Sequence, residues 1–167
     1  MLGDAAGPPY LAHEAMAQAL EAVNHMLGGK ADEKPLLIPN CVYGDLEVAA
    51  VGLTEEEAVK GGRKVKVSEF PFMANGRSGI LGKEEGSIIV VADSVTEDVL
   101  GFHMLGPRVT ELVSLATLAM QNGIDVRGIK KIVFPHPTLL EAFHDAVLGS
   151  DDEANHMRVR SERLENV

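Results

Sequence analysis

The spacing of apolar residues divides the chain into helix-like and strand-like segments. From Tyr10 to Leu27 apolar and small residues recur every three or four positions, which predicts an amphipathic helix. Gly28 and Gly29 mark its end, because glycine readily closes a helix at its C-terminus. The glycine- and proline-rich residues 1–9 predict a loop before this helix.

Asp4 lies in this loop, close to the expected start of the helix. The first N–H groups of a helix have no partner inside it, so they can face a polar or anionic group of a ligand. The alternative is that Asp4 only caps a turn. The loop sequence by itself is compatible with both.

Short runs in the middle of the chain predict β-strands. Residues 64–70 alternate between polar and apolar, as in a sheet with one face in water. The connections at 82–86 and 94–98 are short and polar, so neighbouring strands should pair as antiparallel hairpins. The other expected strands are residues 41–43, 46–51, 77–81, 87–93 and 100–105.

Further helices are expected around these strands. Thr54 and Glu57 have the spacing of a capping box, which would open a short helix that ends before Gly61. Residues 108–121 have helical spacing, and 126–130 predict a helical turn. The fold class is therefore α+β: a mainly antiparallel sheet of about five strands with helices packed on one face, preceded by a long N-terminal helix.

Composition narrows the functions that this chain can have. With 167 residues, 46% of them hydrophobic and 24% charged, it suits one compact domain. The net charge of −10 argues against binding to nucleic acid. Cys41 is the only cysteine, so neither an intrachain disulfide nor a thiolate metal cluster can form, and we expect no metal site. No membrane segment or signal peptide is evident, which favours a cytoplasmic location.

The segment from Phe134 to Glu141 carries the best candidate chemistry. Pro135 and Pro137 fix the backbone on both sides of His136, so the imidazole lies on a rigid, non-helical segment. Glu141 would project from the first turn of the following helix and reach back to His136. A carboxylate that accepts the proton of one imidazole nitrogen leaves the other nitrogen free to act as a base.

A structural interpretation competes with this dyad. Thr138 and Glu141 also have the spacing of a capping box, with Thr138 as the N-cap of the helix. Glu141 would then bind the backbone N–H of Thr138 and have no catalytic function. The two interpretations make different use of the same carboxylate.

Five stretches, in order along the chain, resemble one protein family. They are the Gly3-Asp4 loop with residues 9–13, then residues 39–55, 72–77 and 100–107, and finally the segment His136–Glu141. Together they resemble the C-terminal part of the dihydrolipoamide dehydrogenases, flavin-dependent members of the pyridine nucleotide–disulfide oxidoreductases. The resemblance covers about residues 3–147, with departures at Gly44 and Leu46, where the family usually has Thr and Pro.

The resemblance implies two sets of functional residues. His136 would act as the base toward the thiol of dihydrolipoamide, oriented by Glu141, in the active site of the other subunit. A second set would contact FAD, with the aspartate on the ribityl chain and the start of the helix facing the pyrimidine edge of the flavin ring. The residues of this second set are Asp4, Leu11, Ala12 and His13.

Two family features are missing from the sequence. The redox-active disulfide needs two cysteines, and Cys41 stands alone. The dinucleotide fingerprint G-x-G-x-x-G does not occur in the 167 residues. FAD and NAD would therefore belong to the complete enzyme, and we expect this chain alone to bind neither tightly and to be inactive.

These observations lead to one main hypothesis and two alternatives. The chain is a dimerisation domain that self-associates, as a homodimer, and carries the His–Glu base. Alternatively, it is a subunit of a split FAD- and NAD-dependent dihydrolipoamide dehydrogenase, active only with a partner chain. A third possibility is docking on the acyltransferase core of a 2-oxoacid dehydrogenase complex, for which an acidic surface suits a basic partner.

Three regions are expected along the chain. Residues 1–34 would be a remnant of a flavin domain, made of the loop and the long helix. Residues 35–149 would form the dimerisation domain. Residues 150–167 are almost all polar and would be a surface tail with helical propensity.

Overall fold

The computed structural model of the chain describes residues 1–30, 35–151 and 162–164. It contains two compact units, Met1–Ile38 and Pro39–Val167. The boundary between these units lies near the one expected at residues 34/35, whereas the division into three regions and their functional assignment stay predictions. In the described part of the chain, no helix combines the length and apolar character that crossing a bilayer requires.

The first unit consists of a short 3₁₀ helix and a long α-helix. The 3₁₀ helix η1 (Gly3–Ala6) leads into α1 (Ala12–Met26), which confirms the predicted N-terminal helix. The two are joined by a hydrogen bond from the N–H of Gly3 to Oε1 of Gln18, at 2.7 Å. This bond holds the loop that carries Asp4 against the flank of α1.

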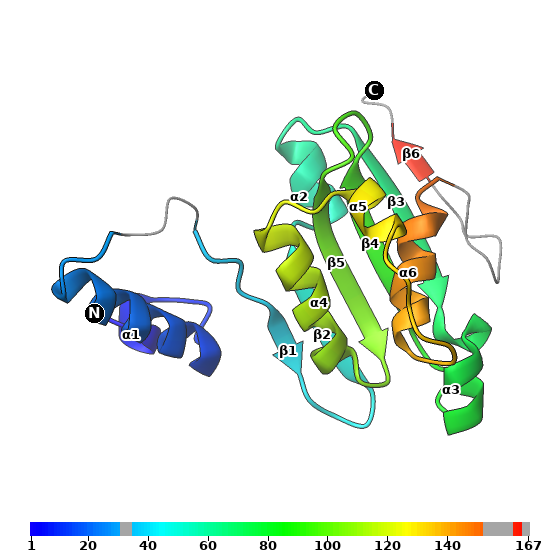
Figure 1. The fold of residues 1–167 in the computed structure, drawn as a ribbon, viewed down its shortest axis with the longest axis horizontal. Coiled ribbons are helices and arrows are strands. Elements are labelled where there is room, and N and C mark those ends of the chain that lie inside the picture. Colours follow the sequence, from blue (N-terminus) through cyan, green and yellow to red (C-terminus); the bar gives the residue numbers. More distant parts are fainter. Residues whose placement is uncertain (31–34, 152–161, 165–167) are drawn as a thin grey trace. The chain divides into compact units, whose positions relative to one another are not determined.

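The second unit is built on one antiparallel sheet (Figure 1). Its strand order is β1-β2-β5-β4-β3-β6, and every neighbouring pair is antiparallel. The sheet and fold class predicted from sequence are thus confirmed. The strands are β1 (Asn40–Val42), β2 (Glu47–Gly52), β3 (Val65–Pro71), β4 (Ser87–Asp93), β5 (Val99–Gly106) and β6 (Glu162–Leu164).

Two helices cover one face of this sheet. Helix α4 (Val109–Gln121) packs on β2 and β5, and α6 (Leu140–Gly149) packs on β3 and β4 (Figure 1). The short α5 (Val126–Lys130) lies beside α6. The rings of Phe102 on β5 and Phe143 on α6 stack with centroids 4.6 Å apart, and both are fully buried. Such buried aromatic pairs dominate core energetics, so they fix α6 on the sheet.

Helix α2 (Glu55–Lys60) packs on the opposite face. Its buried Ala58 contacts Val65 and Val91. Ser68, also on β3, donates to the carbonyl of Ala146 on α6 and therefore faces that helix. Side chains alternate along a strand, so Val65, three residues earlier, points to the opposite face. The capping box predicted for α2 is present, with Thr54 and Glu57 bonded reciprocally.

One predicted strand is wrong. Residues 77–81 belong to helix α3 (Gly76–Leu81) and do not form a strand. The side chain of Asn75 accepts the N–H of Ser78 at the start of this helix, and Gly82 ends it in the left-handed conformation with φ of 64°. Both signals were present in the sequence, but the adjacent Ile80 and Leu81 resembled a strand although they are exposed.

The expected polar tail falls partly outside the described residues, namely at 152–161 and 165–167. What is described differs from a helical surface extension. Ser150 is buried, Asp151 is paired with two lysines, and residues 162–164 form β6 against β3. Backbone pairing with an exposed strand edge explains this strand, which has no apolar pattern in the sequence.

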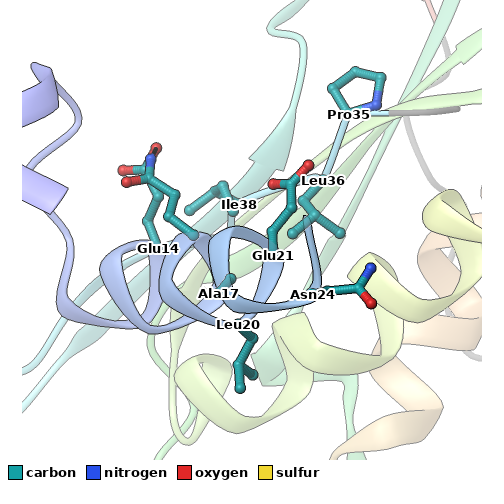
Figure 2. Close-up of a pocket in the computed structure, with 9 residues that line it drawn as sticks. Glu14, Ala17, Leu20, Glu21, Asn24, Pro35, Leu36 and Ile38 are labelled. Carbon is teal, nitrogen blue, oxygen red and sulfur yellow. Dashed lines mark hydrogen bonds between the residues drawn. The ribbon is translucent and has the colours of Figure 1, made fainter. Parts of the chain in front are cut away.

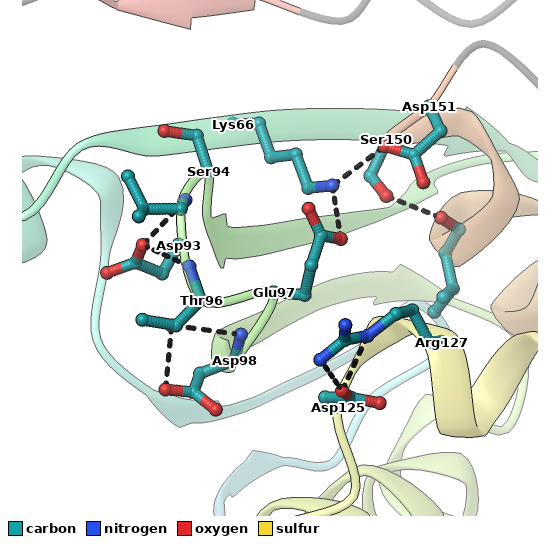
Figure 3. A network of polar contacts seen from close by, with 12 residues as sticks. Lys66, Asp93, Ser94, Thr96, Glu97, Asp98, Asp125, Arg127, Ser150 and Asp151 are labelled. Atoms are coloured by element: carbon teal, nitrogen blue, oxygen red, sulfur yellow. Dashed lines mark hydrogen bonds and ion pairs between the residues drawn. The ribbon is translucent and has the colours of Figure 1, made fainter.

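A network of charged groups ties the end of α6 to the sheet (Figure 3). Lys66 on β3 is only 3% exposed, and its Nζ lies 2.6 Å from Glu97 and 2.7 Å from Asp151. Lys130 of α5 also pairs with Asp151. Burial by itself would raise the pKa of Asp151, but the hydrogen bonds from Lys130 and Lys66 outweigh this and hold its pKa below the usual range.

This network predicts a pH-dependent contribution to stability. Because the pKa of Asp151 is lower in the folded chain than in the unfolded chain, its stabilisation is complete above the unfolded pKa of about 4 and is lost as the pH falls through the folded pKa. Asp151→Asn should therefore lower the free energy of unfolding at pH 7, and the difference from wild type should shrink below pH ~4. Urea unfolding at several pH values measures this.

Asp45→Asn is the matched control, because Asp45 is an exposed carboxylate in the turn between β1 and β2. It should change the free energy of unfolding by less than about 0.5 kcal/mol. A loss for Asp151→Asn that is equally large at pH 3 and pH 7 would contradict the assigned ion pairs.

Candidate functional site

The His136 segment lies between α5 and α6 and belongs to neither helix nor strand. The peptide bond between His136 and Pro137 is cis. Helix α6 begins at Leu140 with Leu139 as its N-cap residue, and no side chain caps it. The prediction that Thr138 is the N-cap was therefore wrong by one position: its hydroxyl donates to the carbonyl of Pro135 and caps no N–H of the helix.

The structure brings His136 and Glu141 together. Nδ1 of His136 lies 2.8 Å from Oε1 of Glu141. The imidazole is 73% exposed, whereas the carboxylate is only 16% exposed. A ring this exposed has few packing contacts to restrain it, so the carboxylate of Glu141 beside Nδ1 is the group that orients it.

Glu141 serves both interpretations of the sequence at the same time. Its Oε2 accepts the backbone N–H of Thr138 at 2.7 Å, as in a capping box, while its Oε1 contacts His136. The hydroxyl of Thr138 does not return a capping bond and donates to the carbonyl of Pro135 at 2.8 Å. The cap is thus half-formed, and the two proposed uses of the carboxylate are not alternatives.

This arrangement determines what the imidazole can do. A carboxylate accepts only, so Nδ1 of the neutral ring is the protonated nitrogen and donates to Glu141. Nε2 then has a free lone pair on the exposed side of the ring and can accept a proton. Because the ring is so exposed, a substrate would be enclosed only by a second surface placed over it.

Asn75 is a contributor that sequence reasoning missed. Its Nδ2 donates to the carbonyl of Thr138 at 3.0 Å, across 63 residues of sequence. The N-cap signal of Asn75 in front of α3 was recognisable in the sequence, but its second partner is not local. Asn75 therefore connects α3 to the segment that carries His136.

The candidate flavin contacts lie together at the start of the first unit. Leu11 is the N-cap residue of α1, Ala12 and His13 begin the helix, and no side chain caps it. Asp4 is exposed in η1. Asp4 and the start of α1 thus belong to the same unit, and their contact with a flavin stays a prediction.

A groove of about 550 Å³ in the same unit does not include these residues (Figure 2). It lies between α1 and the segment that follows it, and two carboxylates, Glu14 and Glu21, line it together with Asn24. Its remaining lining residues are Ala17, Gln18, Leu20, Pro35, Leu36 and Ile38.

Other titratable residues have structural surroundings. Cys41 is half-buried on β1; burial raises the pKa of its thiol, and nearby Glu47 raises it further against a hydrogen bond from Tyr43. Nε2 of His103 lies 3.0 Å from the carbonyl of Leu53. His144 stacks on Phe134 with ring centroids 4.6 Å apart. Across residues 1–30, 35–151 and 162–164, no group of three or more His, Cys, Asp or Glu side chains could hold a metal ion.

Comparison with known families gives one match over most of the second unit. Residues 38–147 match the family described as pyridine nucleotide-disulphide oxidoreductase, dimerisation domain. The matched range includes both His136 and Glu141, together with Asn75.

Curated relatives extend the similarity into the first unit. The dihydrolipoyl dehydrogenase of Bacillus subtilis is 42% identical over 93% of this chain, and that of Thermus scotoductus is 44% identical over 93%. The mitochondrial dihydrolipoyl dehydrogenase of Caenorhabditis elegans is 38% identical over 89% of this chain. These alignments cover 33%, 34% and 30% of the relatives, so the chain spans about a third of their length.

Solved structures share the fold. LpdA from Mycobacterium tuberculosis superposes with a TM-score of 0.81 at 25% identity, covering 87% of this chain and 32% of that one. The HOCl-induced flavoprotein disulfide reductase RclA from Escherichia coli has a TM-score of 0.81 at 22% identity, covering 87% of this chain and 34% of that one.

The contact between His136 and Glu141 predicts the position of a proton. Glu141→Ala removes the acceptor for Nδ1, so the share of neutral His136 rings protonated on Nδ1 should fall. Long-range ¹H–¹⁵N correlation spectra of the ¹⁵N-labelled chain measure this share from the two ring nitrogen shifts. His103 is the internal control, since its ring contacts Leu53 and should be unaffected. Unchanged His136 nitrogen shifts would show that the carboxylate does not orient the ring.

Proposed function

Because this chain belongs to the dimerisation-domain family of the pyridine nucleotide-disulphide oxidoreductases, we propose that it is the dimerisation domain of a dihydrolipoamide dehydrogenase. In this proposal it contributes the catalytic base pair His136–Glu141 to the active site of a partner subunit. The contact between the exposed imidazole of His136 and the carboxylate of Glu141 is the observation that carries the proposal.

The proposed chemistry is proton abstraction from a thiol. A free thiol has a pKa of about 8.5 and is a weak nucleophile until it is deprotonated. Nε2 of His136 accepts the proton of dihydrolipoamide, and the charge that then develops on the ring is stabilised by Glu141 at Nδ1. The resulting thiolate attacks a disulfide held by the other subunit, and the sulfur displaced from that disulfide leaves as a thiolate.

FAD and NAD carry the electrons in the complete enzyme. The part of a flavin site proposed in this chain consists of the exposed carboxylate of Asp4 and the first-turn N–H groups at Leu11, Ala12 and His13. The sequence has one cysteine and no G-x-G-x-x-G fingerprint, so the disulfide and the main dinucleotide phosphate sites must come from other residues. The chain alone should therefore purify without the flavin colour.

A row of exposed apolar side chains supports the dimerisation function. Val42, Val48 and Leu105 are direct cross-strand neighbours on β1, β2 and β5, on the face of the sheet that α4 and α6 leave uncovered. Exposed apolar groups arranged contiguously favour association, and the same surface on two copies gives an isologous homodimer.

The alternative is a subunit of a split enzyme, whose partner chain carries both dinucleotide domains. The span of about a third of the relatives' length favours it as much as it favours a domain of a longer chain. Flavin absorbance that appears only after mixing with a chain that carries both dinucleotide domains would identify the split enzyme.

A third possibility is docking on an acyltransferase core, because the charge of −10 suits a basic partner. A cytoplasmic location is also part of the proposal.

Self-association is the first prediction of this proposal. Size-exclusion chromatography with light scattering should give a mass of twice the 17.8 kDa chain at micromolar concentration. Val48→Glu places a charge in the apolar row and should raise the dimer dissociation constant at least ten-fold. Val95→Glu is the matched control, because Val95 is exposed in the turn between β4 and β5. A monomer at all concentrations would contradict dimerisation.

Complementation tests the base in trans. The subunit to be complemented is a full-length dihydrolipoamide dehydrogenase in which the histidine equivalent to His136 is replaced by glutamine. Heterodimers with the wild-type chain should recover about 10²–10⁴-fold activity in dihydrolipoamide oxidation, the usual contribution of a positioned base. Activity is followed as NADH formation.

The control is the same chain with His136→Gln, which should form heterodimers and restore no activity. Native mass spectrometry reports heterodimer formation independently of activity. Heterodimers that form with the wild-type chain but stay inactive would refute His136 as the base.

A further inference from the structure

Asn75 occupies a buried position between helix α3 and the segment that carries His136. It is only 5% exposed, at the start of α3, and both ends of its amide are bonded. Oδ1 accepts the N–H of Ser78 at 3.0 Å and its hydroxyl at 3.2 Å. Nδ2 donates to the carbonyl of Thr138 at 3.0 Å.

The orientation of this amide is determined by its two partners. The N–H of Ser78 requires an acceptor, and the carbonyl of Thr138 requires a donor. Only one of the two amide orientations satisfies both. Capping α3 uses the oxygen alone, so the nitrogen of Asn75 is used for the segment that carries His136.

Thr138 transmits this contact to the imidazole. Its carbonyl is held by Asn75, and the N–H of the same residue donates to Oε2 of Glu141 at 2.7 Å. Oε1 of that carboxylate contacts Nδ1 of His136 at 2.8 Å. A shift of the Thr138 backbone would therefore turn the carboxylate that orients the exposed ring.

We propose that Asn75 is a positioning residue for the His136 base, acting through Thr138 and Glu141. That His136 acts as a base rests on the proposed function. The link from Asn75 to the orientation of the ring is a property of this chain alone. Asn75 does not touch the substrate. Its contribution is to restrict the loop backbone so that Nε2 of His136 keeps one direction.

Two substitutions separate positioning from helix capping. Serine and aspartate are as good N-cap residues as asparagine, so Asn75→Ser and Asn75→Asp keep the acceptor for Ser78 and lose the Nδ2 donor to Thr138. Ser78→Ala is the matched control, because it removes the hydroxyl contact to Oδ1 and leaves the Nδ2 donor in place.

The experiment records the ring nitrogen shifts of His136 in the ¹⁵N-labelled 167-residue chain. With Asn75→Ser and Asn75→Asp, the share of rings protonated on Nδ1 should fall at least two-fold, whereas Ser78→Ala should leave it unchanged. Equal shifts in all three variants, or no shift in the two Asn75 variants, would overturn the proposal.

A measurement on the wild-type chain keeps the test valid if the variants do not fold. The hydrogen bond predicts a scalar coupling between Nδ2 of Asn75 and the carbonyl carbon of Thr138, and its absence would overturn the proposal. In the complementation assay Asn75→Ser should reduce the restored activity about ten-fold, less than loss of the base itself. If no chain restores activity but the ring shifts respond, the proposed function fails and the link from Asn75 to the ring stands.

Discussion

The carboxylate of Glu141 is the interaction on which the candidate site depends. One oxygen holds the backbone of the loop at Thr138, and the other holds the ring of His136. Because the carboxylate is largely shielded from water, both bonds are stronger than they would be on the surface. The loop and the imidazole are therefore coupled, and neither can change conformation without breaking a charge-assisted hydrogen bond.

Glu141 in turn takes its place from helix α6. The helix is anchored at three levels: Phe143 stacks on Phe102 of the sheet, Ser68 donates to the carbonyl of Ala146, and Asp151 beyond its end pairs with Lys66. Each anchor comes from a strand of the antiparallel sheet. The direction of one exposed ring is thus linked, through Glu141 and α6, to the buried core of the unit, which is the arrangement that the proposed catalytic base would require.

The sequence predicted what is local and failed where partners are distant. His136 and Glu141 are five residues apart, so their contact follows from the prolines and the helix that begins behind them. Asn75 contacts Thr138 across 63 residues, and no local pattern contains that information. Helix α3 was mistaken for a strand because Ile80 and Leu81 are apolar but exposed. The spacing of apolar residues therefore does not mark a buried face of this helix. Strand β6 forms by backbone pairing with β3, which needs no apolar pattern, so the sequence contains no signal for it.

Among the described residues, the two edge strands of the sheet, β1 and β6, contain three residues each. A long free edge would recruit further strands one after another and produce open-ended aggregates. Short edge strands offer few backbone groups for such growth. In the proposed homodimer the apolar row on the flat of the sheet would be covered once by a second copy, so association would close after two chains and would not continue as a polymer.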